Sequence, residues 1–382
     1  MEQIKQNKLL TYMVSALFSL MLVISLAACG NTATVEEPKT EPAQSQEQTK
    51  AEEKKDEKKD EKQATAAKGD TRTIKDSEGK EVEVPAQVDK AAPTIGAFAH
   101  ITSMLGAQDK VVASVTKLSD IYHKVFPKAN PNNTDVKNVE EVIASGAQVV
   151  YGPNVSDEQQ AQYDAAGVTT VKINAFSNAE ELKSTISLIA DILGGDAPEK
   201  AKKFNERYDA IIKEVSDKAK TIPEDQKKKV LNLRVSGDNY TAQTAKDISA
   251  FYVETAGGIF ASKDFAPSGK DRVVGAEQIV AWAPDVIFTM GQSAKDTIMN
   301  DPALQSVPAV KNGQVFVEPY GTYQWSVRSA EGALMPYFLA KITYPEVFKD
   351  LSVEEETKKF YKDMYNYDLT DEEVATIMAG DK

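Results

Sequence analysis

Residues 196–223, DAPEKAKKFNERYDAIIKEVSDKAKTIP, carry the clearest helix signal in the chain. Asp196 is placed to cap the start with Glu199 three residues on, and Pro198 suits the first turn. Apolar side chains then recur at helical spacing, at Ala201, Phe204, Tyr208, Ile211, Ile212, Val215 and Ala219. A helix of about sixteen to twenty-five residues spans roughly 24 to 38 Å, which is long enough to run down the side of two lobes and join them.

Short apolar runs alternate with helical segments on both sides of this helix. We expect strands at 92–98, 111–114, 148–151, 169–173, 229–235, 285–288 and 315–317. We expect helices at 157–166, 179–193, 248–256, 276–282 and 331–342. Such alternation is typical of β/α units with a mostly parallel sheet. We therefore predict an α/β fold of two Rossmann-like lobes with mostly parallel sheets, linked by a single long backbone helix: an N-terminal lobe at 70–195, the linking helix at 196–222, and a C-terminal lobe with a helical tail at 223–382.

An internal repeat supports two lobes. VEEVIASGAQVVY at 139–151 aligns without gaps on AEQIVAWAPDVIF at 276–288. Each copy reads as a short helix that leads into a buried strand, so the two halves repeat one structural unit.

The first thirty residues read as an export signal. Lys5 and Lys8 give a positive start, and an apolar run follows from Leu9 to Leu26. The run Leu26-Ala27-Ala28-Cys29-Gly30 is a lipobox, which predicts a lipoprotein signal peptide at 1–28 and acylation of Cys29; the alternative is a core cysteine in a helix. Because the chain has one cysteine, lipidation would leave no thiol for disulfides, thiolate metal sites or nucleophilic catalysis.

Residues 29–69 are expected to form a disordered, charged tether behind the lipidated cysteine. The stretch is built from Glu, Lys, Gln, Ala and Thr and contains EEKKDEKKDEK. Such a composition buries too little apolar surface to offset the entropy of ordering. Two acyl chains anchor a protein stably, so we expect the chain to work at the outer face of the cell membrane, held by its lipid anchor.

Two counts over the whole chain exclude classes of function. The formal net charge of −13 argues against nucleic acid and against broad contact with an anionic membrane surface. A site for a bare zinc or manganese ion needs several converging ligands, but the chain has two histidines and, once Cys29 is acylated, no thiol. A metal is therefore expected to arrive wrapped in its chelator, and no resident cofactor is expected.

Four segments in order resemble the ABC-importer binding proteins for ferric siderophores, haem and cobalamin. They are TRTIKDSEGKEVEVP (71–85), NVEEVIASGAQVVYG (138–152), GAEQIVAWAPDVIFTMG (275–291) and LQSVPAVKNGQVFVEPYGTYQWSVRSAEGALMPYFLAKITYPEVF (304–348). The resemblance covers the chain from Thr71 to about Asp350; the first repeat departs from it with Gly146-Ala147-Gln148 where the family has a Lys-Pro-Asp-like turn. It implies a solute-binding lipoprotein that captures a ferric-siderophore-type iron complex between its lobes and delivers it to an ABC permease and its ATPase. The protein is expected to be a monomer and not to be an enzyme.

Loops after the strand ends are where such a fold places its ligand. The predicted ligand-binding residues are Lys117, Tyr122, His123, Tyr151, Arg234, Lys270, Arg272, Tyr323, Trp325 and Arg328. They mix cations with aromatics, as anionic ferric catecholates and hydroxamates require, because guanidinium groups pair with oxyanions and stack on π faces. Phe98, Tyr240 and His100 lie on the same loops, and for His100 a structural role is the alternative.

Several of these residues have a second reading. Trp325 could wedge a loop against the last helix, and Arg328 could pair with Glu331 instead of a ligand. Lys270 and Arg272 flank Asp271 before a helix and could lie in a solvated loop.

Glu140 and Glu277 occupy equivalent positions in the two repeats. The resemblance implies that they meet arginines on the permease, one per lobe, while capping alone would also favour a carboxylate near a helix N-terminus.

Other functions stay open at this point. Cobalamin, haem or an oxyanion such as molybdate could replace the iron complex. A surface scaffold or an enzyme could also reuse the fold, although no nucleophile elbow, phosphate loop or HExxH motif is present.

Overall fold

The structure is a computed structural model that describes residues 70–237, 239–267 and 272–380. The predicted signal peptide, Cys29, the tether and Lys270 lie outside these described residues. The described residues all belong to one compact unit. No helix in the described ranges combines the length and apolarity that a membrane crossing needs.

The N-terminal lobe is built on a parallel sheet in the order β3-β4-β5. Its strands are β3 (Ala91–Pro93), β4 (Val149–Gly152) and β5 (Thr169–Lys172), and Val150 pairs with Ala92 and Thr170. Its helices are α2 (Gly96–Thr102), α3 (Asp120–Val125), α4 (Val139–Ala144), α5 (Asp157–Ala165) and α6 (Ala179–Leu193). An antiparallel hairpin of β1 (Thr71–Lys75) and β2 (Glu81–Pro85), which we did not predict as strands, opens the lobe.

The C-terminal lobe holds a larger, mixed sheet in the order β11-β10-β6-β7-β9, with β8 paired to β6. Its strands are β6 (Lys229–Ser236), β7 (Asn239–Ala242), β8 (Ile259–Phe260), β9 (Val273–Val274), β10 (Val286–Thr289) and β11 (Val315–Val317). Its helices are α8 (Ile248–Thr255), α9 (Ala276–Trp282), α10 (Gln292–Asn300), α11 (Pro308–Lys311) and α12 (Met335–Thr343), the last preceded by the 3₁₀ turn η5 (Ala330–Leu334). The β6, β8, β10 and β11 pairings are parallel and the β6–β7–β9 edge is antiparallel.

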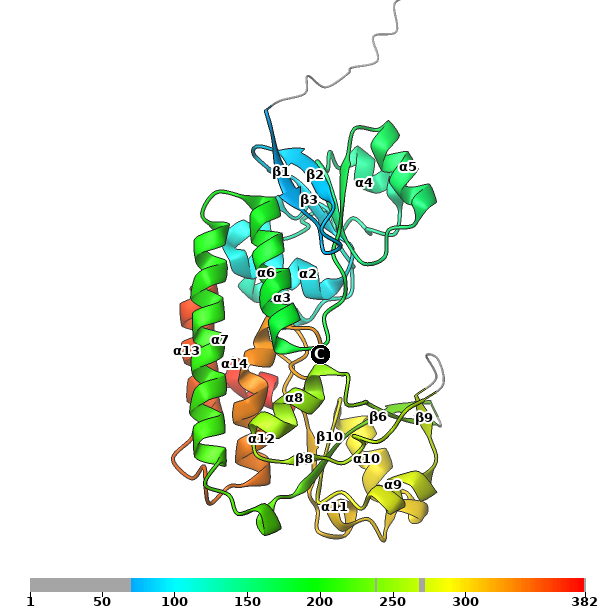
Figure 1. Cartoon of the computed structure of the whole chain (residues 1–382), viewed down its shortest axis with the longest axis vertical. Coiled ribbons are helices and arrows are strands. Elements are labelled where there is room, and N and C mark those ends of the chain that lie inside the picture. The colour runs from blue at the N-terminus through cyan, green and yellow to red at the C-terminus, as the bar shows by residue number, and fades with distance from the viewer. Residues whose placement is uncertain (1–69, 238, 268–271, 381–382) are drawn as a thin grey trace, which may run out of the picture. The chain divides into compact units, whose positions relative to one another are not determined.

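Helix α7 (Ala197–Ala219) links the lobes, as predicted, and Figure 1 shows it running beside both of them. Its 23 residues span about 34 Å at 1.5 Å each. The predicted apolar stripe is buried, apart from the half-buried Ile212. The expected cap is wrong in detail: the Asp196 side chain makes no capping bond and pairs instead with Lys200, at 2.8 Å.

Two predicted strands differ from the structure. The stretch 92–98 is strand only to Pro93, after which Gly96 opens α2 and carries Phe98 into a helix. Residues 111–114 form isolated bridges, Ala91 to Val111 and Ser114 to Asp135, rather than a strand. Apolar runs this short do not distinguish strand from buried helix or loop. The predicted helix at 331–342 is divided between η5 and α12.

The C-terminal tail is two helices, α13 (Val353–Tyr365) and α14 (Asp371–Ala379). Helix α13 runs alongside α7 in Figure 1, and Phe360 meets Phe204 edge-on. One continuous apolar core takes in residues of both lobes, of α7 and of the tail as far as Ile377. The lobes are therefore joined by packing as well as by a single helix.

Candidate functional site

The two lobes meet where α2 begins. A Cβ added at Gly96 would lie 2.9 Å from Tyr323 Cε2, 3.1 Å from Leu118 Cδ2 and 3.2 Å from Val115 Cγ2. Tyr323 comes from the loop after β11, which we define as residues 318–329 and call the C-loop. Val115 and Leu118 come from residues 115–119 after the Val111–Ser114 bridges, which we call the N-loop. Only a residue without a side chain lets the two loops approach α2 this closely.

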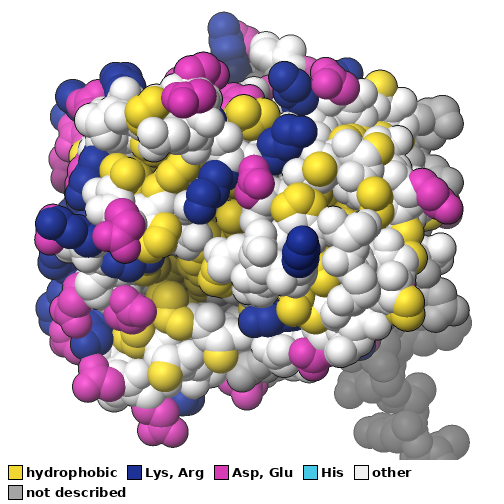
Figure 2. All heavy atoms as spheres, turned by 90° about the horizontal axis from the view of Figure 1, so that it is seen from below, with side chains coloured by type: hydrophobic (Ala, Val, Ile, Leu, Met, Phe, Trp, Pro, Cys, Tyr) yellow, Lys and Arg dark blue, Asp and Glu magenta, His cyan; other side chains and the backbone are white. Residues whose placement is uncertain are grey.

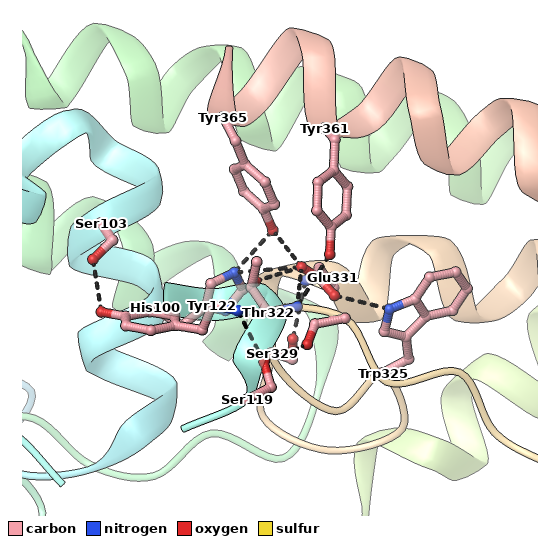
Figure 3. A network of polar contacts seen from close by, with 11 residues as sticks. His100, Ser103, Ser119, Tyr122, Thr322, Trp325, Ser329, Glu331, Tyr361 and Tyr365 are labelled. Atoms are coloured by element: carbon pink, nitrogen blue, oxygen red, sulfur yellow. Dashed lines mark hydrogen bonds and ion pairs between the residues drawn. The ribbon is translucent and has the colours of Figure 1, made fainter. Parts of the chain in front are cut away.

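The C-loop is held from inside by the buried carboxylate of Glu331 (Figure 3). Glu331 Oε2 accepts a hydrogen bond from Trp325 Nε1 at 2.9 Å, and Oε1 accepts from the Thr322 backbone N–H at 3.1 Å and from its hydroxyl. The Tyr361 hydroxyl accepts a second bond from the Thr322 N–H at 3.0 Å. Burial raises the pKa of Glu331, and these hydrogen bonds oppose the rise.

His100 joins this network from the N-terminal lobe. Its Nε2 lies 2.8 Å from the Tyr365 hydroxyl, which donates to Glu331 Oε1 at 3.1 Å. Because that hydroxyl proton points to the carboxylate, the Nε2–H of a neutral histidine is the donor to Tyr365. Burial lowers the pKa of His100 to about 3, so at neutral pH it is uncharged, and the structural alternative describes it. Tyr361, Tyr365 and Thr322 were missed because nothing marks them in the sequence as neighbours of Glu331.

Three predicted ligand residues are buried, which corrects their assignment to an open cleft. Trp325 is fully buried against Glu331, as the wedge alternative expected. Tyr122 and Tyr151 are buried in the N-terminal lobe, where their hydroxyls bond to Ser103 (2.9 Å) and Thr102. Burial raises the pKa of the Tyr122 hydroxyl to about 12 and that of Tyr151 further. Large rings fill cores as readily as they line clefts, and the sequence does not separate the two uses.

Two predicted cations already have carboxylate partners. Arg234 makes a two-pronged ion pair with Glu318, at 3.1 and 3.2 Å, and also bonds Ser326. Arg272 bonds Asp247 at 2.7 Å and Gln243 at 2.7 Å. Arg234 thus ties the end of β6 to the start of the C-loop, and Arg272 ties β9 to α8. Both guanidinium charges are largely neutralised within the fold.

Three further predicted ligand residues are exposed: Lys117, His123 and Arg328. Within the described residues, none of them makes an ion pair with a carboxylate. The expected alternative partner of Arg328, Glu331, is wholly buried and bound to other groups. Tyr323, the one predicted aromatic at the lobe junction, stacks on His100 with ring planes 15° apart. Burial raises the pKa of Tyr323, and the positive charge of Arg328 opposes that rise.

A groove of about 1140 Å³ lies elsewhere, between the β1–β2 turn, α6 and α7. It contains none of the predicted ligand residues. Its charged lining is Lys75, Asp76, Glu180, Glu181, Lys183, Asp191 and Asp209, an acidic excess that does not suit an anion. In the described part of the chain, no group of three or more His, Cys, Asp or Glu side chains could hold a metal ion. The face in Figure 2 intermingles acidic and basic side chains.

The two repeat glutamates are exposed, each in the first turn of its helix. Glu140 is the second residue of α4, which is capped by the Asn138 side chain accepting from the Glu141 N–H. Glu277 is the second residue of α9, whose N-cap is Gly275. Neither carboxylate caps its helix in the described structure, so their matched positions are not explained by a capping bond. Helices α4 and α9 lie on the same side of the view in Figure 1, one on each lobe.

Comparison with known sequences identifies relatives along most of the chain. An uncharacterized ABC transporter substrate-binding lipoprotein of Bacillus subtilis, YvrC, is 28% identical over 283 residues, 73% of this chain and 87% of its own length. The molybdate-binding protein MolA of Haemophilus influenzae is 23% identical over 328 residues, 77% of this chain and 91% of its own. An iron-uptake system-binding protein of Bacillus subtilis is 21% identical over 210 residues, 53% of this chain and 64% of its own.

Solved structures share the fold. A periplasmic solute-binding protein from Veillonella parvula has a TM-score of 0.67 at 23% identity, over 81% of this chain and 97% of its own. MolA bound to molybdate has a TM-score of 0.68 at 20% identity, over 78% and 99%. The sequence model of the periplasmic binding proteins matches residues 95–319, more than half of the chain. The chain therefore belongs to the periplasmic binding protein family, as the solute-binding component of an ABC importer and not an enzyme.

Proposed function

We propose that this protein captures an anionic metal complex of the ferric-siderophore type at the lobe junction and delivers it to its permease. One observation carries the proposal: Lys117, His123 and Arg328 are exposed and lack carboxylate partners in the described structure. Lys117 and Arg328 are cations that the fold leaves unneutralised, so they favour an anionic ligand, and the Arg328 guanidinium offers it a planar set of donors. The iron-uptake relative is consistent with this ligand class.

Molybdate is the second candidate, and a specific observation favours it. Burial of Tyr122, Tyr151 and Trp325 removes three of the four predicted aromatics from ligand contact. A bulky catecholate gains from aromatic stacking, whereas a small oxyanion needs only charge and hydrogen-bond donors. The molybdate-binding relative covers 77% of this chain.

A titration by intrinsic fluorescence separates these candidates. The chain should respond to a ferric catecholate or ferric hydroxamate and ignore free zinc and manganese; a response to molybdate alone would favour the second candidate. Binding of a bare divalent ion with no response to any chelate or to molybdate would overturn the proposed function. Haem and cobalamin should be titrated in the same way.

Arg328→Ala tests the site itself. Loss of one charge-assisted hydrogen bond should weaken binding by roughly 1.5 to 3 kcal/mol, or about ten- to a hundredfold, with little change in the melting temperature. Lys311→Ala removes an exposed cation from α11 and is the matched control. Unchanged affinity in the Arg328 variant would remove this residue from the site.

We also propose lipid anchoring through Cys29 and docking to the permease through Glu140 and Glu277. The repeat, the exposure of both carboxylates and the absence of a capping hydrogen bond from either one in the described structure support the docking. The double change to Gln should leave ligand affinity intact, reduce uptake by cells sharply, and lower the salt sensitivity of the association with the permease. Normal uptake by the double variant would return both residues to a structural role. Labelling with a fatty acid that is lost in Cys29→Ala would confirm the anchor.

A further inference from the structure

The C-terminal tail supplies a large part of what holds the C-loop. The Tyr361 hydroxyl on α13 accepts from the Thr322 N–H at 3.0 Å, and the Tyr365 hydroxyl donates to Glu331 at 3.1 Å. From α14, the Ile377 carbonyl accepts from the Tyr320 N–H at 2.9 Å. Two of these contacts are made to the backbone of the loop that carries Tyr323 and Arg328, and the third is made to the carboxylate that holds this loop.

The same tail is fastened to the linking helix. Arg207 of α7 pairs with Glu356 of α13 at 2.9 Å, with both side chains mostly buried. Lys203 donates to the Asp363 carbonyl at 2.8 Å, and the Phe204 ring meets Phe360 edge-on. Helix α13 is therefore placed by α7, which runs along both lobes.

The tail also reaches the N-terminal lobe. Tyr365 bonds His100 at 2.8 Å and packs edge-on against Phe126, with ring centres 5.2 Å apart. Lys124 of α3 lies 3.7 Å from Glu373 of α14. Across the junction, the Ser119 hydroxyl donates to the Gly321 carbonyl at 2.7 Å. The C-loop is thus connected, directly or through the tail, to both lobes and to α7.

We propose that α13 and α14 form a clamp that fixes the spacing of the lobes and positions the C-loop for ligand, with Tyr365 and Tyr361 as its positioning residues. Neither hydroxyl needs to touch ligand. Glu331 is wholly buried, so its carboxylate must keep its donors. A shift of the loop breaks its hydrogen bonds to Glu331 and Tyr361 together. One position of the loop is therefore strongly preferred. The role in binding rests on the proposed function, because it assumes that Tyr323 and Arg328 face ligand.

The first experiment needs no ligand. It uses the full chain carrying Cys29→Ser, with cysteines introduced at Glu158 of α5 and Lys311 of α11. Spin labels on these two cysteines report the distance between the lobes by pulsed electron paramagnetic resonance. Both positions are exposed, and Cys29 is the chain's sole cysteine. We expect one narrow distance distribution, and a broader one in Tyr365→Phe, which removes a single hydroxyl. Tyr361→Phe, an independent variant, should broaden it too.

Tyr344→Phe is the matched control. The Tyr344 hydroxyl also makes two hydrogen bonds, to the Gly257 carbonyl at 2.9 Å and from the Lys228 N–H at 2.8 Å, both within the C-terminal lobe. Its loss should therefore lower stability to a similar extent and leave the distance distribution narrow. A narrow distribution in both Tyr365→Phe and Tyr361→Phe would overturn the clamp. Broadening in all three variants alike would also overturn it, because the tail would then be acting through stability only.

The second experiment measures binding of a ferric hydroxamate to the same variants. Tyr365→Phe should bind about tenfold more weakly, because it loses both the bond from His100 and the bond to the Glu331 carboxylate. Tyr344→Phe should bind like the wild type. Equal affinity of all variants for a ligand that the wild type binds would overturn the positioning role. If the wild type binds no ferric hydroxamate, ferric catecholate or molybdate while Tyr365→Phe still broadens the distances, the proposed function fails and the clamp stands.

Discussion

The N-loop and the C-loop meet at Gly96 but are held very differently. The C-loop is bonded to Glu331, to α13, to α14 and, through Arg234 and Glu318, to the end of β6. The N-loop is fastened at its end, where Ser119 caps α3 on the Tyr122 N–H and bonds Gly321. In the described structure, residues 115–118 otherwise make one hydrogen bond, from the Ser114 hydroxyl to the Val115 carbonyl.

The difference assigns separate tasks to the two sides of the junction. A loop with few bonds opens locally at small cost, whereas a loop tied into a buried network moves only when the network breaks. The C-loop therefore presents Tyr323 and Arg328 in a fixed arrangement. Under the proposed function, adjustment to the ligand would fall to the N-loop and Lys117.

The largest expected effect is at Glu331. Glu331→Ala leaves the Trp325 indole N–H and the Thr322 hydroxyl without their buried acceptor, at about 1 to 3 kcal/mol each. We therefore expect a loss of about 3 kcal/mol or more in the free energy of unfolding, measured in denaturant. Glu331→Gln keeps one acceptor oxygen. It also removes the buried carboxyl group, whose pKa is raised by burial, and it should lower the free energy of unfolding much less. The exposed Glu346→Ala is the control. Equal stability of Glu331→Ala and Glu346→Ala would show that Glu331 does not hold the C-loop in place.

A smaller effect is expected from acid. Burial lowers the His100 pKa from 6.5 to about 3, so the unfolded chain binds the extra proton first, and this contribution to stability is lost as the pH falls below about 6.5. The raised pKa of Glu331 acts in the opposite direction. His100→Gln should lose about 2 kcal/mol less than the wild type between pH 6.5 and 4.5. His123→Gln, an exposed change, should follow the wild-type curve; if His100→Gln follows it too, His100 is not held neutral by burial.

The smallest effect is expected at Gly96. A methyl group there, 2.9 Å from Tyr323 Cε2, must displace the ring or the N-loop side chains. Gly96→Ala should change stability by about 1 kcal/mol at most, because the gain from a less flexible unfolded chain offsets part of the crowding. It should nevertheless weaken ligand binding. At Gly275, the N-cap of α9, an added methyl group meets only the Glu277 side chain, so Gly275→Ala should bind ligand normally. Equal binding by both variants would show that Gly96 does not contribute to the binding site.

The architecture could be predicted because it follows from local patterns. The apolar stripe of α7 and the bounds of α6, α9 and β11 were predicted to the residue or nearly so. The site was predicted only in part, because burial depends on distant partners. Trp325 and Arg328 are three residues apart, yet one is fully buried and the other exposed. Trp325 is held inside by Glu331, and Glu331 is itself bonded by Tyr365, in the tail beyond the segments that carry the family resemblance.

Hydrogen exchange of the two loops tests the account most directly. In the ligand-free protein, the amides of Tyr320, Gly321 and Thr322 are hydrogen-bonded and should exchange slowly, close to the rate set by global unfolding. Amides of residues 115–118 should exchange fast and become protected when ligand binds. Fast exchange at 320–322 in the ligand-free protein, with protection appearing only on binding, would contradict a preformed C-loop.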